Sequence, residues 1–176
     1  MREFDSPAVF QWFSILLFLF ISFPVQALTI QQEEMLSLAY EYGETIQAII
    51  LVESSAIPGQ IGDNGTAFGL AQVTIPAALH AIEYYNLPVD TERLSTKLIT
   101  DHQFNLYIAS YYFKYLMERF GNWRKAVVAY NVGPSGVENI KDINDFIYLK
   151  KICHRIITVV RPFNENRLLN FFNLYC

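Results

Sequence analysis

The stretch TIQAIILVESS, over residues 45–55, is the strongest constraint on how this chain folds. Its isoleucines recur at i, i+3 and i+4, on one face of a helix: Ile46, Ile49 and Ile50. Gln47 is the only other polar residue before Glu53, which occupies the next position on that face. A helix that is apolar nearly all round is typical of a buried element. We expect Thr45 to cap it and Glu53 to end it.

The first 27 residues are predicted to be a signal peptide. Trp12–Phe23 is apolar except for two serines, which is short for a membrane span but typical of a signal-peptide core. A small-residue cleavage site follows at Ala27. Arg2 is the only basic residue in this segment, so an uncleaved N-terminal anchor remains the alternative. Both interpretations place residues 28–176 outside the cytoplasm, and we expect an exported, periplasmic protein.

Composition narrows the classes of partner. The formal net charge is −4, and no run of Lys and Arg is interleaved with aromatic residues, so nucleic-acid binding is not expected. The histidines are too far apart for a metal site, and no cofactor is expected: His80, His102 and His154. Cys153 and Cys176 form a possible disulfide in an oxidising compartment, with two separate thiols as the alternative.

Periodicity and capping residues predict a mostly α-helical single domain with very little β-structure. We expect helices over residues 29–42, 45–53, 76–86, 101–120, 122–131 and 144–160, the last ending before Pro162, and a short one over 166–176. The expected N-caps are Thr29, Thr45, Thr74, Thr100 and Asn122. Four glycines and the turn sequence of Asp63–Gly65 mark residues 55–69 as a loop, where any β-hairpin is expected.

Glu53 is the candidate catalytic residue. Its apolar neighbours and the partial negative charge at a helix C-terminus both disfavour the charged carboxylate. No Lys or Arg occurs between Glu44 and Tyr85 to offset these effects locally. A neutral carboxyl group is what general-acid catalysis requires near neutral pH. The helix alone does not exclude the alternative, a glutamate that turns into solvent.

Four segments occur in an order that resembles the soluble lytic transglycosylase family. They are the ESS of Glu53–Ser55, the GTAFGLAQVT of Gly65–Thr74, the NLYIASYYF of Asn105–Phe113 and the AYNVGPSGV of Ala129–Val137. A weaker similarity to a later Tyr-Val pair of the family falls at Tyr148–Leu149. The resemblance implies a goose-lysozyme-like α+β fold with an active-site cleft. Ala71 and Ala109 depart from the family's Met and Gly.

The resemblance implies cleavage of the glycosidic bond between N-acetylmuramic acid and N-acetylglucosamine in peptidoglycan, with a 1,6-anhydro product. Glu53 is then the acid and afterwards the base. The substrate-binding candidates are Ser54, Phe68, Gly69, Gln72, Tyr130 and Asn131. A hydrolytic lysozyme and a non-catalytic peptidoglycan-binding assembly protein remain alternatives. Asp63 is a candidate second carboxylate, although turn chemistry alone explains an Asp-Asn-Gly sequence.

The resemblance also suggests a division of the chain and a set of partners. We expect the catalytic domain at 28–140 and a helical extension, packed on it, at 141–176. The loop IGDNGTAFG resembles the small transglycosylases that accompany secretion systems and conjugative pili, so components of such a machine are possible partners besides the glycan strands. Contact with a membrane is expected only if the leader is not cleaved.

Overall fold

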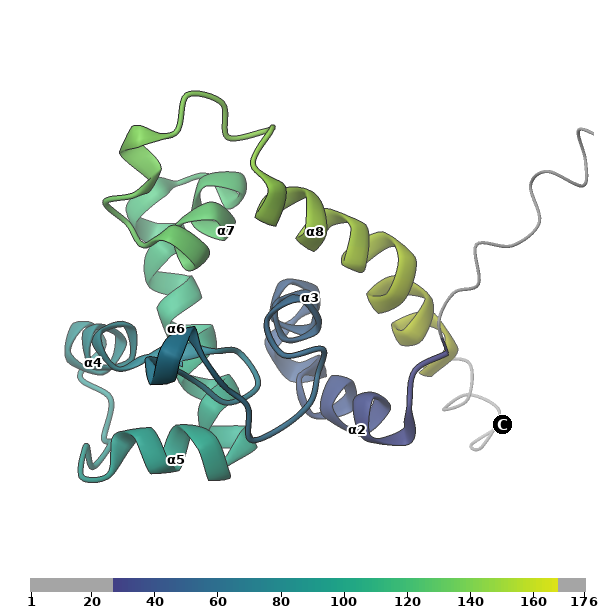
Figure 1. Cartoon of the computed structure of the whole chain (residues 1–176), viewed down its shortest axis with the longest axis horizontal. Coiled ribbons are helices and arrows are strands. Elements are labelled where there is room, and N and C mark those ends of the chain that lie inside the picture. Colours follow the sequence, from purple (N-terminus) through teal and green to yellow (C-terminus); the bar gives the residue numbers. More distant parts are fainter. Residues whose placement is uncertain (1–26, 168–176) are drawn as a thin grey trace, which may run out of the picture.

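Helix α3 (Glu44–Glu53) lies in the middle of the fold, between α6 (His102–Phe120) and α8 (Ile147–Arg155), as Figure 1 shows. The computed structural model describes residues 27–167. Residues 46–50 of α3 are all at most 1% exposed, so the helix is buried as its composition predicts. The chain therefore wraps the apolar helix and brings its C-terminal end to the place where the later motifs meet.

The described chain is mostly helical, with one small sheet, which confirms the predicted fold class. The remaining helical elements are α2 (Ile30–Leu38), η1 (Tyr40–Tyr42), η2 (Asp63–Gly65), α4 (Ile75–Tyr84), α5 (Leu94–Thr100), α7 (Trp123–Val132), η3 (Val137–Asn139) and η4 (Ile156–Val160). The strands are β1 (Ile61–Gly62), β2 (Ala67–Phe68) and β3 (Val73–Thr74). Contacts between α6 and α7 and between α4 and α6 extend the core away from α3.

The predicted hairpin forms in the loop after α3. Strands β1 and β2 are antiparallel, with Gly62 opposite Ala67, and η2 makes the turn between them. Strand β3 adds to β2, with Phe68 opposite Val73. A side chain at Gly62 would collide with Oε1 of Gln72, so any larger residue here would require the Gln72 side chain to move.

Most of the predicted helix caps are present. Thr29 forms a capping box with Gln32, and the side chains of Thr74 and Asn122 accept hydrogen bonds from the backbone N–H groups of Ala77 and Lys125. These caps depend only on residues within one turn, which is why the sequence predicts them.

Two predicted caps are wrong. Helix α3 begins one residue before Thr45, after Gly43 with φ +87°, and the Thr45 hydroxyl instead accepts a hydrogen bond from the Trp123 indole at 3.0 Å. Thr100 ends α5, and its neighbour Asp101 caps α6 by accepting from the backbone N–H of Phe104 at 2.9 Å. The negative charge of an aspartate is stabilised at a helix N-terminus, and a threonine has no such charge.

The helix after α7 also differs from its prediction. It begins at Ile147 rather than near residue 144, and it continues through Pro162 to residue 167. Pro162 has no N–H to donate to the carbonyl four residues back. The π-helical segment η4 lies directly before it, with the Arg161 N–H donating to the Ile156 carbonyl, and this wider turn replaces the α-helical pattern at the proline.

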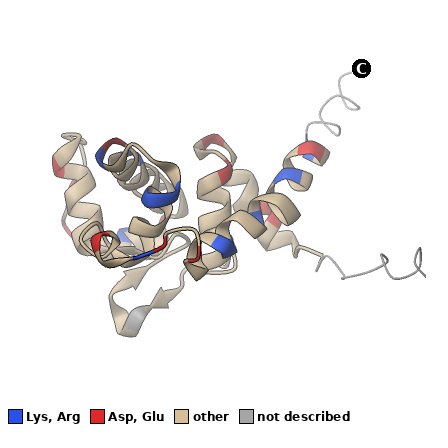
Figure 2. Cartoon of the chain, turned by 90° about the horizontal axis from the view of Figure 1, so that it is seen from above, with Lys and Arg blue, Asp and Glu red and all other residues tan. Residues whose placement is uncertain are grey.

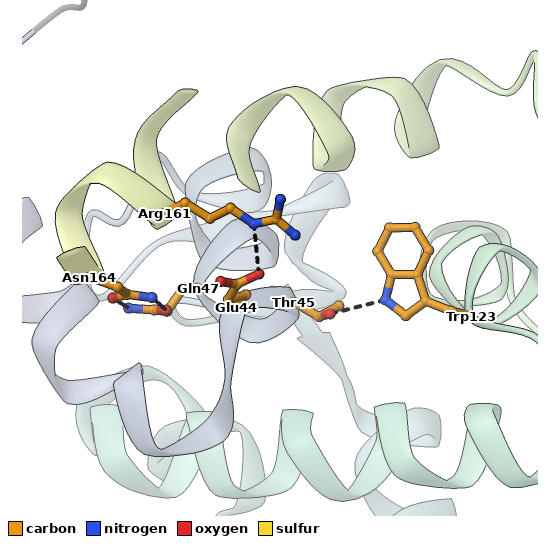
Figure 3. A network of polar contacts seen from close by, with 6 residues as sticks. All are labelled: Glu44, Thr45, Gln47, Trp123, Arg161 and Asn164. Carbon is orange, nitrogen blue, oxygen red and sulfur yellow. Dashed lines mark hydrogen bonds and ion pairs between the residues drawn. The ribbon is translucent and has the colours of Figure 1, made fainter. Parts of the chain in front are cut away.

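Polar contacts join the first half of α3 to this C-terminal helix (Figure 3). The amides of Gln47, which is fully buried, and Asn164 exchange hydrogen bonds of 3.1 and 2.9 Å. Arg161 Nε lies 3.3 Å from Glu44 Oε2. Because α8 and η4 also pack along α3, the two helices are held together at the end opposite Glu53.

Several predictions concern residues outside the described range. The predicted signal peptide lies outside this range except for Ala27. The apolar tail from Leu168 onward, which includes Cys176, also lies outside it. Cys153 is half-buried in α8, and its pairing with Cys176 stays a prediction. Between residues 27 and 167, no helix has both the length and the apolar character needed to cross a membrane.

Candidate active site

Glu53 is the last residue of α3, and its carboxylate meets a tyrosine from the far end of the chain. The Tyr148 hydroxyl donates a hydrogen bond to Oε1 of Glu53 at 2.6 Å. Tyr148 lies in the first turn of α8 and is 7% exposed. Burial, together with the neighbouring Glu53 carboxylate, raises the pKa of the Tyr148 phenol well above its usual value. The phenol therefore keeps its proton and remains a donor at neutral and moderately alkaline pH.

Tyr130 approaches the same carboxylate from α7. Its hydroxyl donates to the Ala71 carbonyl at 3.0 Å, and its ring lies 5.7 Å from that of Tyr112. Burial, with Glu53 as the second cause, raises the pKa of the Tyr130 phenol well above its usual value. Tyr130 thus connects the acid to the loop that follows the sheet.

The chain leaves α3 through a tight turn directly after Glu53. The Ser54 side chain is buried, and its hydroxyl lies 2.7 Å from the Leu70 carbonyl and 3.1 Å from the Ile50 carbonyl. Ser55 and Ala56 both have positive φ, +56° and +54°, which is uncommon for residues other than glycine. The Ala56 N–H closes the turn onto the Ile50 carbonyl at 2.8 Å. Ser54 therefore ends the helix and also fastens it to the motif around Leu70.

Asn105 organises the GLAQ loop from inside the core. This fully buried amide accepts a hydrogen bond from the Ala71 N–H at 2.9 Å and donates to the carbonyls of Phe68 and Leu98 at 2.8 and 3.0 Å. Gly69 packs so closely on it, with φ +74°, that a side chain at Gly69 would collide with the Asn105 amide and the Leu98 carbonyl. The amide thus determines the path of residues 68–71.

Gln72 and Phe68 occupy the two ends of this loop. Gln72 has φ +47°, and its amide donates to the carbonyls of Gly69 at 2.7 Å and Gln60 at 3.2 Å. Its side chain therefore braces the loop onto the sheet. Phe68 is half-buried and packs against the core. Three of the uncommon positive φ values, at Ser55, Ala56 and Gln72, thus lie on the two segments around Glu53, and such backbone strain clusters at functional sites.

The family comparison agrees with this geometry. The model of the transglycosylase SLT domain matches residues 32–147, about two thirds of the chain. The chain belongs to the transglycosylase SLT family. Among curated proteins, none matches it. Membership indicates a lytic transglycosylase that acts on peptidoglycan. All four motifs that resemble this family lie within the matched range.

Three of the SLT motifs lie close together in the fold. Glu53, Tyr130 and the 68–72 loop are connected through Ala71 and Leu70. The two departures from the family pattern, Ala71 and Ala109, are both fully buried. The substrate-binding roles of Ser54, Phe68, Gly69, Gln72, Tyr130 and Asn131 stay predictions.

Two further candidates lie on other elements. Asn131 is exposed in the last turn of α7. Asp63 begins η2 in the turn between β1 and β2, as its turn chemistry predicts. In the described part of the chain, no group of three or more His, Cys, Asp and Glu residues is arranged to hold a metal ion.

Two residues of this site were missing from the sequence-based set. Tyr148 lies one residue beyond the SLT match, and its only signal was the weak similarity at Tyr148–Leu149. Asn105 had a clearer signal, because it begins the NLYIASYYF motif. A polar residue on an otherwise apolar stretch of α6 has to find buried partners, and Asn105 finds them in the GLAQ loop.

Proposed function

We propose that this chain cleaves the bond between N-acetylmuramic acid and N-acetylglucosamine and leaves a 1,6-anhydromuramic end, with Glu53 as the catalytic residue. The observation that carries the proposal is the 2.6 Å hydrogen bond from the buried Tyr148 hydroxyl to Glu53 Oε1, at the C-terminal end of an apolar helix. A carboxyl group fixed in this way is suited to proton transfer in a defined direction.

The proposed reaction uses this carboxyl group twice. Glu53 first donates its proton to the glycosidic oxygen as the bond to the muramic carbon breaks and an oxocarbenium-like state develops. We assign the donated proton to Oε2, since Tyr148 already donates to Oε1. The carboxylate then accepts the proton of the sugar's 6-hydroxyl as that oxygen bonds to the muramic carbon. No water is consumed, and Glu53 regains its proton.

Tyr148 supports the second half of this cycle in particular. Its hydrogen bond stabilises the carboxylate form of Glu53, which has to exist between the two proton transfers. Tyr130 contributes indirectly, because its hydroxyl donates to the Ala71 carbonyl and so holds the loop that carries Gln72. The side chains of Phe68, Gln72 and Asn131 are the proposed contacts to the sugar.

The second candidate function is hydrolysis by the same acid. A hydrolase of this type generally requires a second carboxylate that activates water or acts as nucleophile. Asp63 is the candidate from the sequence, and it lies in the turn of the small hairpin. The motif order and the SLT match favour the anhydro product.

The cellular setting is part of the proposal. The leader over residues 1–27 supports export to the periplasm, where the substrate lies. The loop sequence IGDNGTAFG supports a role in opening the wall locally during assembly of a secretion or conjugation machine.

Mass spectrometry of digested peptidoglycan tests the proposed reaction. Purified wild-type protein is expected to release muropeptides with 1,6-anhydro ends, which are one water lighter than the reducing forms. Glu53→Gln keeps the shape of the side chain but has no acidic proton, so it is expected to lose activity by about 10²-fold or more. Mainly reducing muramic ends would instead identify a hydrolase. A folded Glu53→Gln protein with wild-type activity would refute the role of Glu53.

A further inference from the structure

A pocket with one basic wall lies beside the end of α3, next to Glu53. It has a volume of about 300 Å³ and is formed by two helices that run past each other. Its lining residues come from the last turn of α3 with the turn after it, and from the second half of α8: Leu51, Val52, Ser55, Lys151, His154 and Arg155. Apolar side chains thus form one wall, and nitrogen-bearing side chains form the other.

The charge of this pocket is not balanced by the protein itself. Lys151, His154 and Arg155 occupy positions i, i+3 and i+4 of α8 and so share one side of the helix. None of the described residues that line the pocket carries a carboxylate. Within residues 27–167, neither Lys151 nor Arg155 takes part in an ion pair, whereas Lys150 pairs with Asp145 at 2.9 Å.

This concentration of cations contrasts with the composition of the chain. The sequence has 13 basic and 17 acidic residues, so a cluster of basic side chains is not a consequence of overall charge. Figure 2 shows basic segments recurring along the helix that leads to the C-terminal end of the described chain. A partly enclosed pocket with unpaired cations attracts anionic groups.

The pocket also lies at a defined place relative to the acid. Val52 precedes Glu53, and Ser55 follows it by two residues, so the apolar wall continues the helix end that carries the acid. On the other wall, Tyr148 contacts Glu53, and Lys151 and Arg155 follow it by three and seven residues. At 1.5 Å per residue they lie about 5 and 10 Å further along the axis of α8.

We propose that this pocket binds the carboxylates of the peptide stem on the muramic acid residue that Glu53 cleaves. The inference rests on the proposed function, which places that muramic acid at Glu53. The stem leaves the sugar through its lactyl group and carries free carboxylates. An extended peptide advances about 3.3 Å per residue, so two or three stem residues span the distance from the sugar to Lys151 and Arg155.

The pocket would make the enzyme prefer glycan strands that still carry their peptides. Lys151 and Arg155 would contribute through charge, and the His154 imidazole through a hydrogen bond. Because both cations are exposed, each contact is expected to be modest, about 2- to 5-fold in affinity. The effect should appear in KM rather than in kcat, since the pocket lies away from the reacting atoms.

Steady-state kinetics on two forms of one substrate tests the proposal. One form is glycan strands with intact stems, and the other is the same strands after an amidase has removed the stems. The variant Lys151→Gln/Arg155→Gln is expected to raise KM about 5- to 10-fold on stem-bearing strands, with little change on stripped strands. Lys150→Gln/Lys141→Gln removes the same charge from exposed positions outside the lining and is the matched control.

A binding measurement keeps this inference separate from the proposed reaction. Glu53→Gln protein, with and without the two pocket substitutions, is titrated with fluorescent stem-bearing and stripped strands. A loss of binding confined to stem-bearing strands supports the pocket even if the anhydro product is absent. An equal loss on both strands, or no loss on either, overturns the proposal. A phosphate-bearing polymer is also titrated as a competitor. If the two pocket substitutions weaken the binding of that polymer alone, the proposal is overturned and the pocket is assigned to the polymer.

Discussion

The Tyr148 hydroxyl donates to the Glu53 carboxylate at 2.6 Å, although 95 residues separate the two in the chain. The contact exists because α8 packs along α3 and is tied to it at the other end, through Gln47 with Asn164 and Glu44 with Arg161. The position of the acid therefore depends on a helix that begins where the SLT match ends.

Replacing Tyr148 with Phe tests this relationship. The ring keeps its packing while the hydroxyl is lost, so we expect a folded protein with kcat reduced about 10- to 100-fold, the range for a hydrogen bond to a charged group. Loss of the donor disfavours the Glu53 carboxylate, and the reaction starts from protonated Glu53, so the alkaline limb of the pH–rate profile should move to higher pH. Release of anhydromuropeptides as a function of pH measures both effects.

The control for this variant is Tyr112→Phe, which removes the hydroxyl from another buried tyrosine of the same core. It should leave the pH–rate profile in place. If Tyr148→Phe lowers activity without moving the profile, the hydroxyl has a steric or structural role and not an electrostatic one at Glu53.

The sequence predicted those parts of the molecule that depend on near neighbours. The buried character of α3, the caps at Thr29, Thr74 and Asn122 and the hairpin after α3 all follow from residues within a few positions of one another. Helix α5 was not predicted, because it is seven residues long and follows Arg93, which has φ +54° and provides no side-chain cap.

Residues of the candidate site that are far apart in the sequence could be predicted only where each belongs to a recognisable motif. Glu53, Gln72 and Tyr130 were predicted from their motifs, but the residues that they contact were not, since contacts such as that between Ala71 and Tyr130 join residues 59 positions apart. No periodicity encodes a contact between a helix end and a tyrosine near the other end of the chain. Tyr148 could be recognised as a partner of Glu53 only after α8 was placed against α3.

Asn105 is expected to be a stability hot spot as well as a support of the site. Asn105→Ala leaves the Ala71 N–H and the Phe68 and Leu98 carbonyls without their buried partner. Each unsatisfied buried group costs about 1–3 kcal/mol, so the free energy of unfolding should fall by roughly 3–5 kcal/mol. Chemical denaturation measures this change, with the exposed Asn139→Ala as the control that stays within about 0.5 kcal/mol of wild type. A loss below about 1 kcal/mol for Asn105→Ala would mean that water replaces the amide.

Alkaline pH is expected to destabilise the protein through Tyr112. Burial raises the pKa of this phenol from 10.0 to about 12, and the residue is 8% exposed. The unfolded chain therefore loses this proton first as the pH rises, so the stabilising contribution is complete below pH 10 and disappears as pH approaches 12. The contribution lost is about 2–3 kcal/mol.

Urea titrations between pH 8 and 11.5 test this dependence. Tyr112→Phe cannot ionise, so its free energy of unfolding should fall less steeply above pH 10 than that of wild type. Parallel pH curves for the two proteins would show that the phenol ionises equally in the folded and unfolded chains, against the prediction.

The predicted disulfide between Cys153 and Cys176 is compatible with the position of Cys153. This half-buried thiol lines a pocket with Thr45, Trp123 and Ile156. The helix from Cys153 to Arg167 is about 21 Å long at 1.5 Å per residue. The nine residues from Arg167 to Cys176 extend to roughly 30 Å at most, so the chain is long enough to return along the helix.

Oxidation of the exported protein is therefore expected to join Cys153 and Cys176, with two electrons and two protons passing to an external disulfide oxidant. In the chain-entropy model a loop of this size adds about 3 kcal/mol to stability. Non-reducing mass spectrometry should find the protein two hydrogens lighter than the dithiol, with a linked peptide that contains both cysteines. Cys153→Ser/Cys176→Ser should then unfold at lower urea, by about that free energy, while reduced wild type behaves like the variant. Two freely alkylated cysteines in protein recovered from an oxidising compartment would rule the pairing out.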